Sequence, residues 1–230
     1  QFPNISAVTT EIINLEAIMQ LPKGTEHFVS DLHGEYVAFN HVMRNGSGSI
    51  KEKVASCFKD RDNVDIDDLS VLIYYPTGKI TLEENRLNSE EIIHWYRKQI
   101  HLLIEVTLFS STKYTRSKVR KTLDSQYRYI IDELLSESNP VSNKEDYFDT
   151  IIDKVIELGQ AKPLIRSLCI AIQHLVVDHL HVVGDIYDRG PAPDKIIDRL
   201  MAVSSIDIQW GNHDIIWMAA MAGSLVSIMN

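Results

Sequence analysis

The stretch HVVGDIYDRGPAPD, residues 181–194, joins an apolar, strand-like run to a loop that carries aspartates and an arginine. The stretch IDIQWGNHDIIW, residues 206–217, has the same design, and so has EHFVSDLHGE, residues 26–35. In open α/β sheets, ligands bind outside the carboxyl ends of parallel strands. We therefore expect these three loops to meet at one edge of a sheet, although they lie far apart in the sequence.

Helical patterns alternate with these strands, which favours an α/β fold with a mostly parallel sheet. Residues 9–20 carry an apolar helical stripe, with Thr10 as a candidate cap and Pro22 as a stop, and this helix should pack on the residues that follow it. A strand that ends at Asp31 precedes a helix that ends near Gly46. Further elements are predicted as a strand in 178–185, a helix in 191–202, a strand in 205–214 and a final apolar helix.

The chain between residues 47 and 164 is predicted to be a mostly helical insertion. This divides the chain into a sheet-bearing core, residues 1–46 and 165–230, and the inserted helices. Helices are predicted to begin at Asn88-Ser89 and at Arg116 and to end at Gly159, with interruptions at YYPTGKI (74–80) and at the polar joint SESNPVSNKED (136–146).

Composition narrows the class of protein. With 230 residues, 44% of them apolar, and a net charge of -9, the chain can build a core but has no basic footprint for nucleic acid. The sequence shows neither a signal peptide nor an apolar run long enough for a membrane span. Its two cysteines, Cys57 and Cys169, lie far apart, which fits a reducing cytoplasm. Because the chain lacks an initial Met and stops inside an apolar helix, we interpret it as a fragment.

The residue types in the first two loops predict a metal site. Asp31 and His33 alternate, so a carboxylate oxygen and an imidazole nitrogen can point into one site. Mixed oxygen and nitrogen ligands suit Mn, Fe or Zn better than Ca. Asp185 could bridge two cations, and two metals roughly 3.5–4 Å apart would activate a water and clamp an in-line displacement at phosphorus.

Four neighbouring residues predict phosphate chemistry. Arg189 offers a fork of donors for phosphate oxygens. Asn212 supplies an amide oxygen to a metal or an amide donor to phosphate. His213 can donate a proton to the leaving alkoxide if a carboxylate orients its other nitrogen, and Asp188 is the candidate for that partner. Asp214 is interpreted as a helix cap and is left out of the catalytic set.

The three segments resemble the D-x-H-G, G-D-x-x-D-R-G and G-N-H-[D/E] motifs of the calcineurin-like metallophosphoesterases. The resemblance implies a metallophosphoesterase-type β/α sheet core, incomplete in this chain, with a large helical insertion between the first two motifs. It also implies these roles: first-metal ligands Asp31 and His33, bridging ligand Asp185, second-metal ligand Asn212, phosphate ligand Arg189, and leaving-group acid His213 assisted by Asp188.

The helical insertion points to one particular family within this superfamily. Together with YYPTGKI, SSTKYTRSKVRKTL (110–123), NKEDYFD (143–149) and LVVDHLHVVGDIYDRGP (175–191), the whole chain is similar to the Firmicutes-type, or class III, fructose-1,6-bisphosphatases. This implies hydrolysis of the 1-phosphate of fructose 1,6-bisphosphate in gluconeogenesis. It also implies a dinuclear Mn site, completed by residues outside this chain, because no matching Gly-His segments follow Asn212.

The sequence departs from the superfamily pattern at two motif positions and leaves alternatives open. Ser30 stands where many relatives have Gly, and Asp214 replaces a common Glu. Another phosphoesterase, acting on phosphoproteins or dinucleoside polyphosphates, remains an alternative, and so does a non-catalytic interaction or regulatory module. The basic run TKYTRSKVRK (112–121) is a solvated helix face or an anion site for a phosphorylated effector or for another subunit of a homo-oligomer. His179 and His181 are interpreted as structural strand residues.

Overall fold

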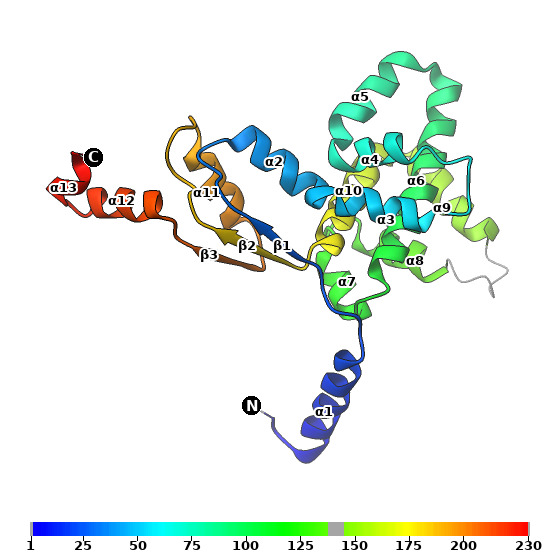
Figure 1. The fold of residues 1–230 in the computed structure, drawn as a ribbon. Helices are drawn as coiled ribbons and strands as arrows, with labels where there is room; N and C mark the ends of the chain where they lie inside the picture. The colour runs from blue at the N-terminus through cyan, green and yellow to red at the C-terminus, as the bar shows by residue number, and fades with distance from the viewer. Residues whose placement is uncertain (1, 138–144, 230) are drawn as a thin grey trace.

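The computed structural model of this protein describes residues 2–137 and 145–229. A small sheet and a larger group of helices lie side by side along its length (Figure 1). The helices are α1 (Ile5–Met19), α2 (Tyr36–Asn45), the short 3-10 helix η1 (Gly46–Gly48), α3 (Ser49–Cys57), α4 (Ile66–Tyr74), α5 (Pro76–Arg86), α6 (Ser89–Ser111), α7 (Arg116–Thr122), α8 (Arg128–Glu137), α9 (Glu145–Glu157), α10 (Ala161–Val176), α11 (Pro193–Met201), α12 (Asn212–Met221) and α13 (Leu225–Ile228).

The sheet has three parallel strands in the order β1 (Glu26–Val29), β2 (His179–Val183) and β3 (Ile206–Gln209). Alternate side chains point to opposite faces, as in any strand. One face carries Leu180 and Val182, which pack with Phe39 of α2 and Ile196 of α11 in a small apolar core. The opposite face is open, since Phe28 on it is 62% exposed. The mixed α/β class and the parallel sheet expected from the sequence are confirmed.

The larger apolar core lies among helices α3 to α10. Helix α6 runs through this group and packs along α10, whose apolar side chains belong to the same core. The predicted start of α6 is confirmed, because the Asn88 side chain accepts hydrogen bonds from the backbone N–H groups of Glu90 and Glu91. The predicted domain boundary between residues 164 and 165 stays a prediction. Helix α10 spans this boundary, and its apolar side chains belong to the helical core.

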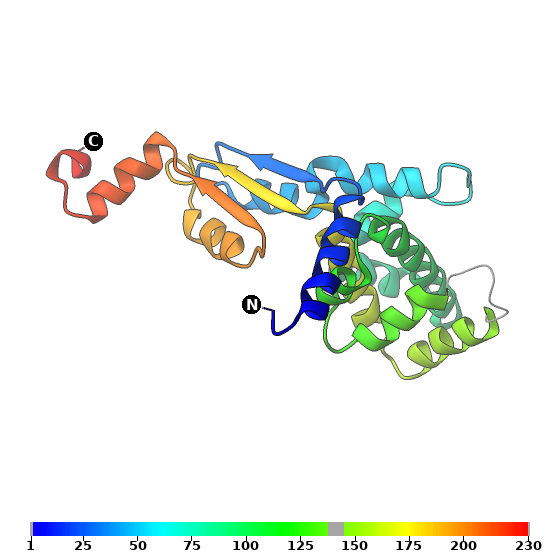
Figure 2. The ribbon, with the colours of Figure 1, turned by 90° about the horizontal axis from the view of Figure 1, so that it is seen from below.

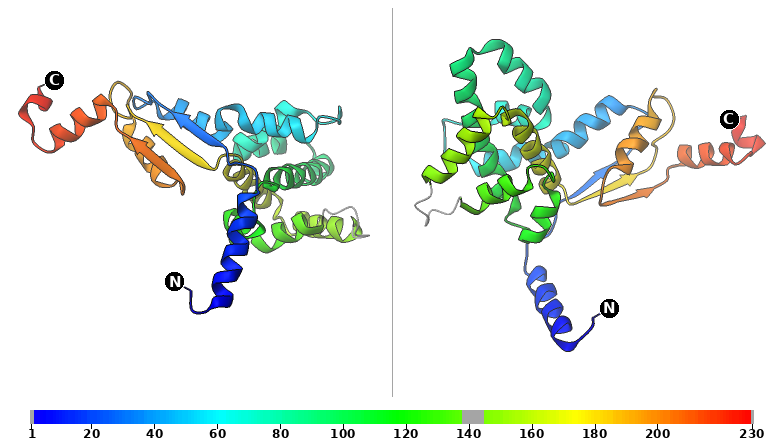
Figure 3. Two further views of the ribbon diagram at one scale, coloured as in Figure 1. Left: turned by 60° about the horizontal axis from the view of Figure 1, so that its bottom comes forward. Right: turned by 180° about the vertical axis from the view of Figure 1, so that it is seen from behind.

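The helix predicted at residues 9–20 forms, but two expectations about it are wrong. It begins at Ile5, because the Asn4 side chain accepts from the Ala7 backbone N–H, so Asn4 rather than Thr10 caps it. None of its residues is buried, and α1 points away from the rest of the molecule (Figures 1 and 3). Apolar periodicity shows that a helix has an apolar face, but it does not show which segment covers that face.

Three predictions about helix boundaries in the helical part have different outcomes. The single helix expected from Arg116 is broken, because Leu123 is extended and Asp124 accepts a hydrogen bond from the Gln126 backbone N–H. The interruption at YYPTGKI is confined to Tyr75, since Pro76 occupies the first turn of α5, where its missing N–H costs nothing. The polar joint lies largely outside the described residues. In the part of the chain that the structure describes, no helix is long and apolar enough to span a membrane.

Candidate functional site

The three motif loops meet beyond the carboxyl ends of the strands, as the sequence predicts. The first two loops are joined by backbone hydrogen bonds: His33 N–H donates to the Asp185 carbonyl at 2.8 Å and Gly34 N–H to the Ile186 carbonyl at 2.8 Å. Gly190 N–H donates in return to the His33 carbonyl at 2.6 Å. Helix α12 begins at the same end of the sheet, directly after β3 (Figure 2).

Glycines allow this close approach of backbones. A Cβ atom on Gly190 would lie 2.3 Å from the His33 carbonyl oxygen, and one on Gly211 would lie 2.0 Å from Asp185 Oδ1. Real Cβ atoms do not come so close to other heavy atoms. The glycines in the quoted motifs are therefore required by loop-to-loop packing.

Strained backbone conformations gather in these loops. The structure gives a positive φ to six described residues other than glycine, and all but Ser47 belong to the first two motif loops: Asp31 (55°), His33 (43°), Asp185 (55°), Asp188 (84°) and Arg189 (66°). Each such conformation costs on the order of 1–3 kcal/mol and is typical of functional sites. The turn at Asp31 also ends β1 at Val29, two residues before the predicted end.

Asp31, His33 and Asp185 form a cluster in which one potential ligand atom of each lies within 4.8 Å of the others. His33 Nδ1 lies 3.4 Å from the Tyr187 carbonyl, which leaves Nε2 facing Asp31 Oδ1 at 3.7 Å. Asp185 Oδ1 is buried and has no hydrogen-bond partner. A buried carboxylate oxygen without a partner is costly, so an imidazole nitrogen beside two carboxylates fits a divalent metal here.

The structure also brings the proposed acid and its partner together. Asp188 Oδ2 lies 3.5 Å from His213 Nδ1 and 3.4 Å from Arg189 Nε. The rings of His33 and His213 meet edge to face with centroids 5.9 Å apart, so this group adjoins the candidate metal cluster. The Arg189 side chain is 71% exposed and accessible to a ligand. Asn212 is exposed at the first residue of α12, and among the described residues the structure records no hydrogen bond from its side chain.

Asp214 has a larger role than the helix cap inferred from sequence. It is fully buried, and its Oδ2 accepts from the Gly211 N–H at 2.9 Å, which caps α12 as predicted. Its Oδ1 accepts from the N–H groups of Ile186 and Tyr187 at 2.8 and 3.0 Å. Asp214 thereby fixes the second motif loop against the third. The sequence indicates that Asp214 caps a helix. It does not indicate the second set of Asp214 partners, which lie about 28 positions away in the chain.

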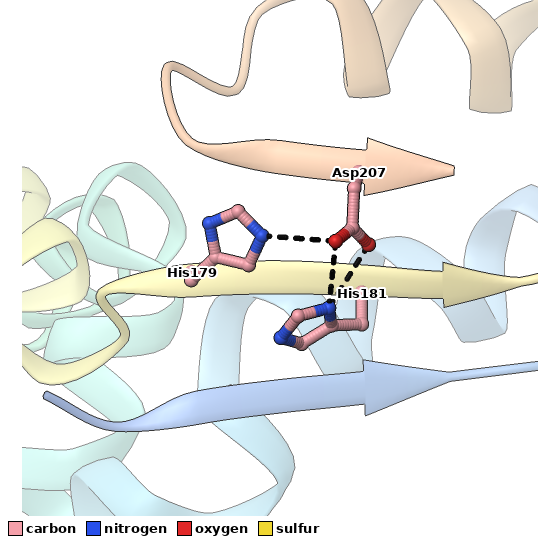
Figure 4. Close-up of side chains that lie close together, drawn as sticks. All are labelled: His179, His181 and Asp207. Carbon is pink, nitrogen blue, oxygen red and sulfur yellow. Dashed lines mark hydrogen bonds and ion pairs between the residues drawn. The ribbon is translucent and has the colours of Figure 1, made fainter. Parts of the chain in front are cut away.

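Two further groups lie outside this site. His179, His181 and Asp207 form a second cluster on the open face of the sheet (Figure 4). The basic run contributes to a hollow of about 610 Å³ lined by Arg116, Ser117, Arg120, Lys121, Arg128 and Asp132. Asp132 lies 3.4 Å from Arg120, so the cations are only partly neutralised.

Comparison with known proteins gives a consistent result over the whole chain. The family model described as Firmicute fructose-1,6-bisphosphatase matches residues 1–230. The chain is 53% identical over 232 residues to the fructose-1,6-bisphosphatase class 3 of Staphylococcus epidermidis, and 54% identical over 231 residues to that of Staphylococcus aureus strain Newman.

These matches cover 100% of this chain but only 36% and 35% of the two relatives. The chain thus spans about a third of the length of the curated relatives it matches. No solved structure matches the chain.

Proposed function

This chain belongs to the Firmicute fructose-1,6-bisphosphatase family, and on that premise we propose that it contributes a catalytic part of an enzyme that hydrolyses the 1-phosphate of fructose 1,6-bisphosphate in gluconeogenesis. The observation that carries the proposal is the meeting of the three motif loops at the carboxyl edge of the sheet. We further propose that this sheet is part of a metallophosphoesterase-type core.

The candidate metal ligands are Asp31, His33 and Asp185, with Asn212 as a ligand of a second ion. Their oxygen and nitrogen donors suit Mn, which we propose as the cofactor. When bound, such a metal pair supplies positive charge to phosphate oxygens and an activated water. The unpartnered Asp185 Oδ1 supports a bridging role for this carboxylate. Residues outside this chain would complete the two coordination shells.

The remaining site residues would act on the phosphate and on the leaving group. Arg189, whose side chain is 71% exposed, would donate to phosphate oxygens from its guanidinium. Asp188, whose Oδ2 lies 3.5 Å from His213 Nδ1, would accept a hydrogen bond from that nitrogen and orient the ring. In the imidazolium form, Nε2 would then carry the proton for the leaving alkoxide. Asp214 holds both loops in register for these contacts.

The test is phosphate release from fructose 1,6-bisphosphate by the full-length protein in the presence of Mn²⁺. Asp185→Asn should lower kcat by on the order of 10²-fold or more, because it removes a charged ligand at the reacting phosphate. Asp198→Asn, at an exposed position of α11, is the matched control and should keep full activity. Equal activity of Asp185→Asn and the parent would refute the mechanism.

A substrate panel separates the alternatives. Faster hydrolysis of a phosphopeptide or a dinucleoside polyphosphate than of the sugar bisphosphate would assign a different substrate class. His213→Ala should lower kcat by about 10²–10⁴-fold on the sugar substrate. It should lower kcat much less on an aryl phosphate, whose leaving group needs no proton. An equal loss on both substrates would contradict the acid role of His213.

The basic hollow is the proposed site of a phosphorylated effector. Arg116, Arg120, Lys121 and Arg128 line it in a chain with a net charge of -9. Arg120→Glu should abolish any thermal stabilisation of the chain by phosphorylated metabolites, while Arg97→Glu, on α6, should not.

The cytoplasm is the proposed location, since Cys57 and Cys169 are both free thiols.

A further inference from the structure

The open face of the sheet carries a cluster of potential ligands that the proposed reaction does not use. His179 and His181 alternate on β2, and Asp207 is the register partner of His181 on β3. All three side chains therefore stand on the same face (Figure 4). One ligand atom of each lies within 4.8 Å of the others. We propose that these three residues form a second metal site, for a divalent ion of the zinc class, separate from the site at the sheet edge.

The distances within the cluster suit a tetrahedral ion. Ligand atoms about 2.0–2.1 Å from zinc in tetrahedral geometry lie about 3.3 Å from one another. Measured to one carboxylate oxygen, Asp207 Oδ2, His181 Nδ1 lies at 3.0 Å and His179 Nε2 at 3.5 Å. These values fall on either side of the tetrahedral spacing, so small side-chain rotations would accommodate an ion.

Metal-bound histidines usually donate a hydrogen bond from their second nitrogen, and both histidines have an acceptor group near that nitrogen. His179 Nδ1 lies 2.8 Å from Ser205 Oγ and would donate its proton there. His181 Nε2 lies 3.5 Å from Glu26 Oε2, but it is buried and makes no hydrogen bond. With a metal on Nδ1, His181 would hold its proton on Nε2, and the Glu26 carboxylate could accept that hydrogen bond.

The rings are held in place before any ion binds. His181 stacks on Phe28 with ring centroids 4.3 Å apart and planes inclined by 12°. The His181 side chain is 22% exposed and that of Asp207 is 56% exposed, so the site opens to solvent on the Asp207 side. Two imidazoles and one carboxylate leave a fourth position open for water or another ligand.

The second site is distinct from the sheet-edge cluster. Its ligands lie within the strands, whereas Asp31, His33 and Asp185 follow the ends of β1 and β2. No residue is shared between the two groups. A variant of either cluster should therefore leave the ligands of the other intact.

The test is titration of the chain with Co²⁺, a spectroscopic substitute for Zn²⁺, followed by its visible absorption. The parent and Asp185→Asn should both develop the intense bands of tetrahedral cobalt. His181→Gln should weaken the binding that produces these bands by at least about tenfold. His94→Gln, at an exposed position of α6, is the matched control and should behave like the parent. Loss of the bands in Asp185→Asn with retention in His181→Gln would overturn the proposal.

A second measurement guards against misfolded variants. In the folded parent, Zn²⁺ should fix His179 as the Nδ1–H tautomer and His181 as the Nε2–H tautomer, which ¹⁵N NMR of the imidazoles distinguishes. Zinc-independent imidazole signals for both residues would also overturn the proposal, because the cluster would then be only a hydrogen-bonded His-Asp-His group. This test does not depend on phosphatase activity, so it stands apart from the proposed function.

Discussion

The helical cluster and the sheet edge use their residues in opposite ways. Among the described residues, the helical core contains 29 buried apolar side chains and the core beneath the sheet only 8. The sheet edge nevertheless holds five of the six left-handed residues other than glycine, for example Asp185 and Arg189. Apolar burial accumulates where the chain is regular, and strain accumulates where ionisable side chains converge. Stability and chemistry are thus largely assigned to different regions.

Asp178 connects the two regions. Its carboxylate accepts from Lys113, two residues after the end of α6, and from Lys118 of α7 at 2.7 and 2.8 Å, and from the Thr25 backbone N–H at 2.8 Å. Thr25 directly precedes β1, and Asp178 directly precedes β2. The helices and the sheet therefore share one ionic junction at the end of the strands opposite the motif loops.

The largest effect is expected from a cavity in the helical core. Leu168→Ala, at a fully buried position of α10, should lower the free energy of unfolding by about 2–5 kcal/mol. Urea denaturation measures the loss, and Ile170→Ala, 48% exposed on the same helix, should cost far less. If the two regions are separable, Mn²⁺ affinity of folded Leu168→Ala, measured by EPR of free Mn²⁺, should equal that of the parent. A parallel loss of Mn²⁺ affinity would show that metal binding at the sheet edge depends on the packing of the helical core.

The next effect tests the sheet edge. Gly211→Ala would place a Cβ against Asp185 Oδ1 and the Asp185 backbone nitrogen, so we expect a loss of up to about 3 kcal/mol and weaker Mn²⁺ binding. Gly78→Ala is the matched change in the helical cluster, since a Cβ there meets no atom within 4 Å. Gly78→Ala should stabilise α5 by up to about 1 kcal/mol. Equal effects of the two substitutions on metal binding would contradict the role of close loop packing.

The smallest effect concerns the junction. Burial alone would raise the pKa of Asp178, but hydrogen bonds from Lys113, Lys118 and the Thr25 backbone N–H outweigh it and lower the pKa to about 2. The unfolded chain has a pKa near 3.9, so the unfolded state binds the proton more readily. The stabilisation, about 2 kcal/mol, is present above pH 4 and is lost as the pH falls through 2.

Urea unfolding at a series of acid pH values checks this prediction. Asp178→Asn should lower the stability at pH 6 and flatten its dependence between pH 4 and 2. Asp153→Asn is the control, because Asp153 forms an exposed pair with Arg97 that should contribute at most about 1 kcal/mol. If the free energy of unfolding of Asp178→Asn had the same acid dependence as that of the parent, the ionised Asp178 carboxylate would not be the stabilising group at this junction.

The elements were predicted well where local signals are strong. Asn88 begins α6, Gly46 ends α2 in a left-handed conformation, and the strands follow the apolar runs. The expected packing of α1 was wrong because its partner cannot be read from its own periodicity. The break at Leu123 was missed because a local hydrogen bond to Asp124 overrides a continuous helical pattern.

The sequence by itself determined the parallel α/β class and the residue types of the proposed metal and phosphate site, because strand alternation and short motifs are local. Only the tertiary structure decided how those residues are held. The buried Asp214 bond to the second motif loop and the pairing of His179 and His181 with Asp207 join residues that lie about 26–28 positions apart. Such contacts depend on strand register and chain reversal, which periodicity and spacing do not encode.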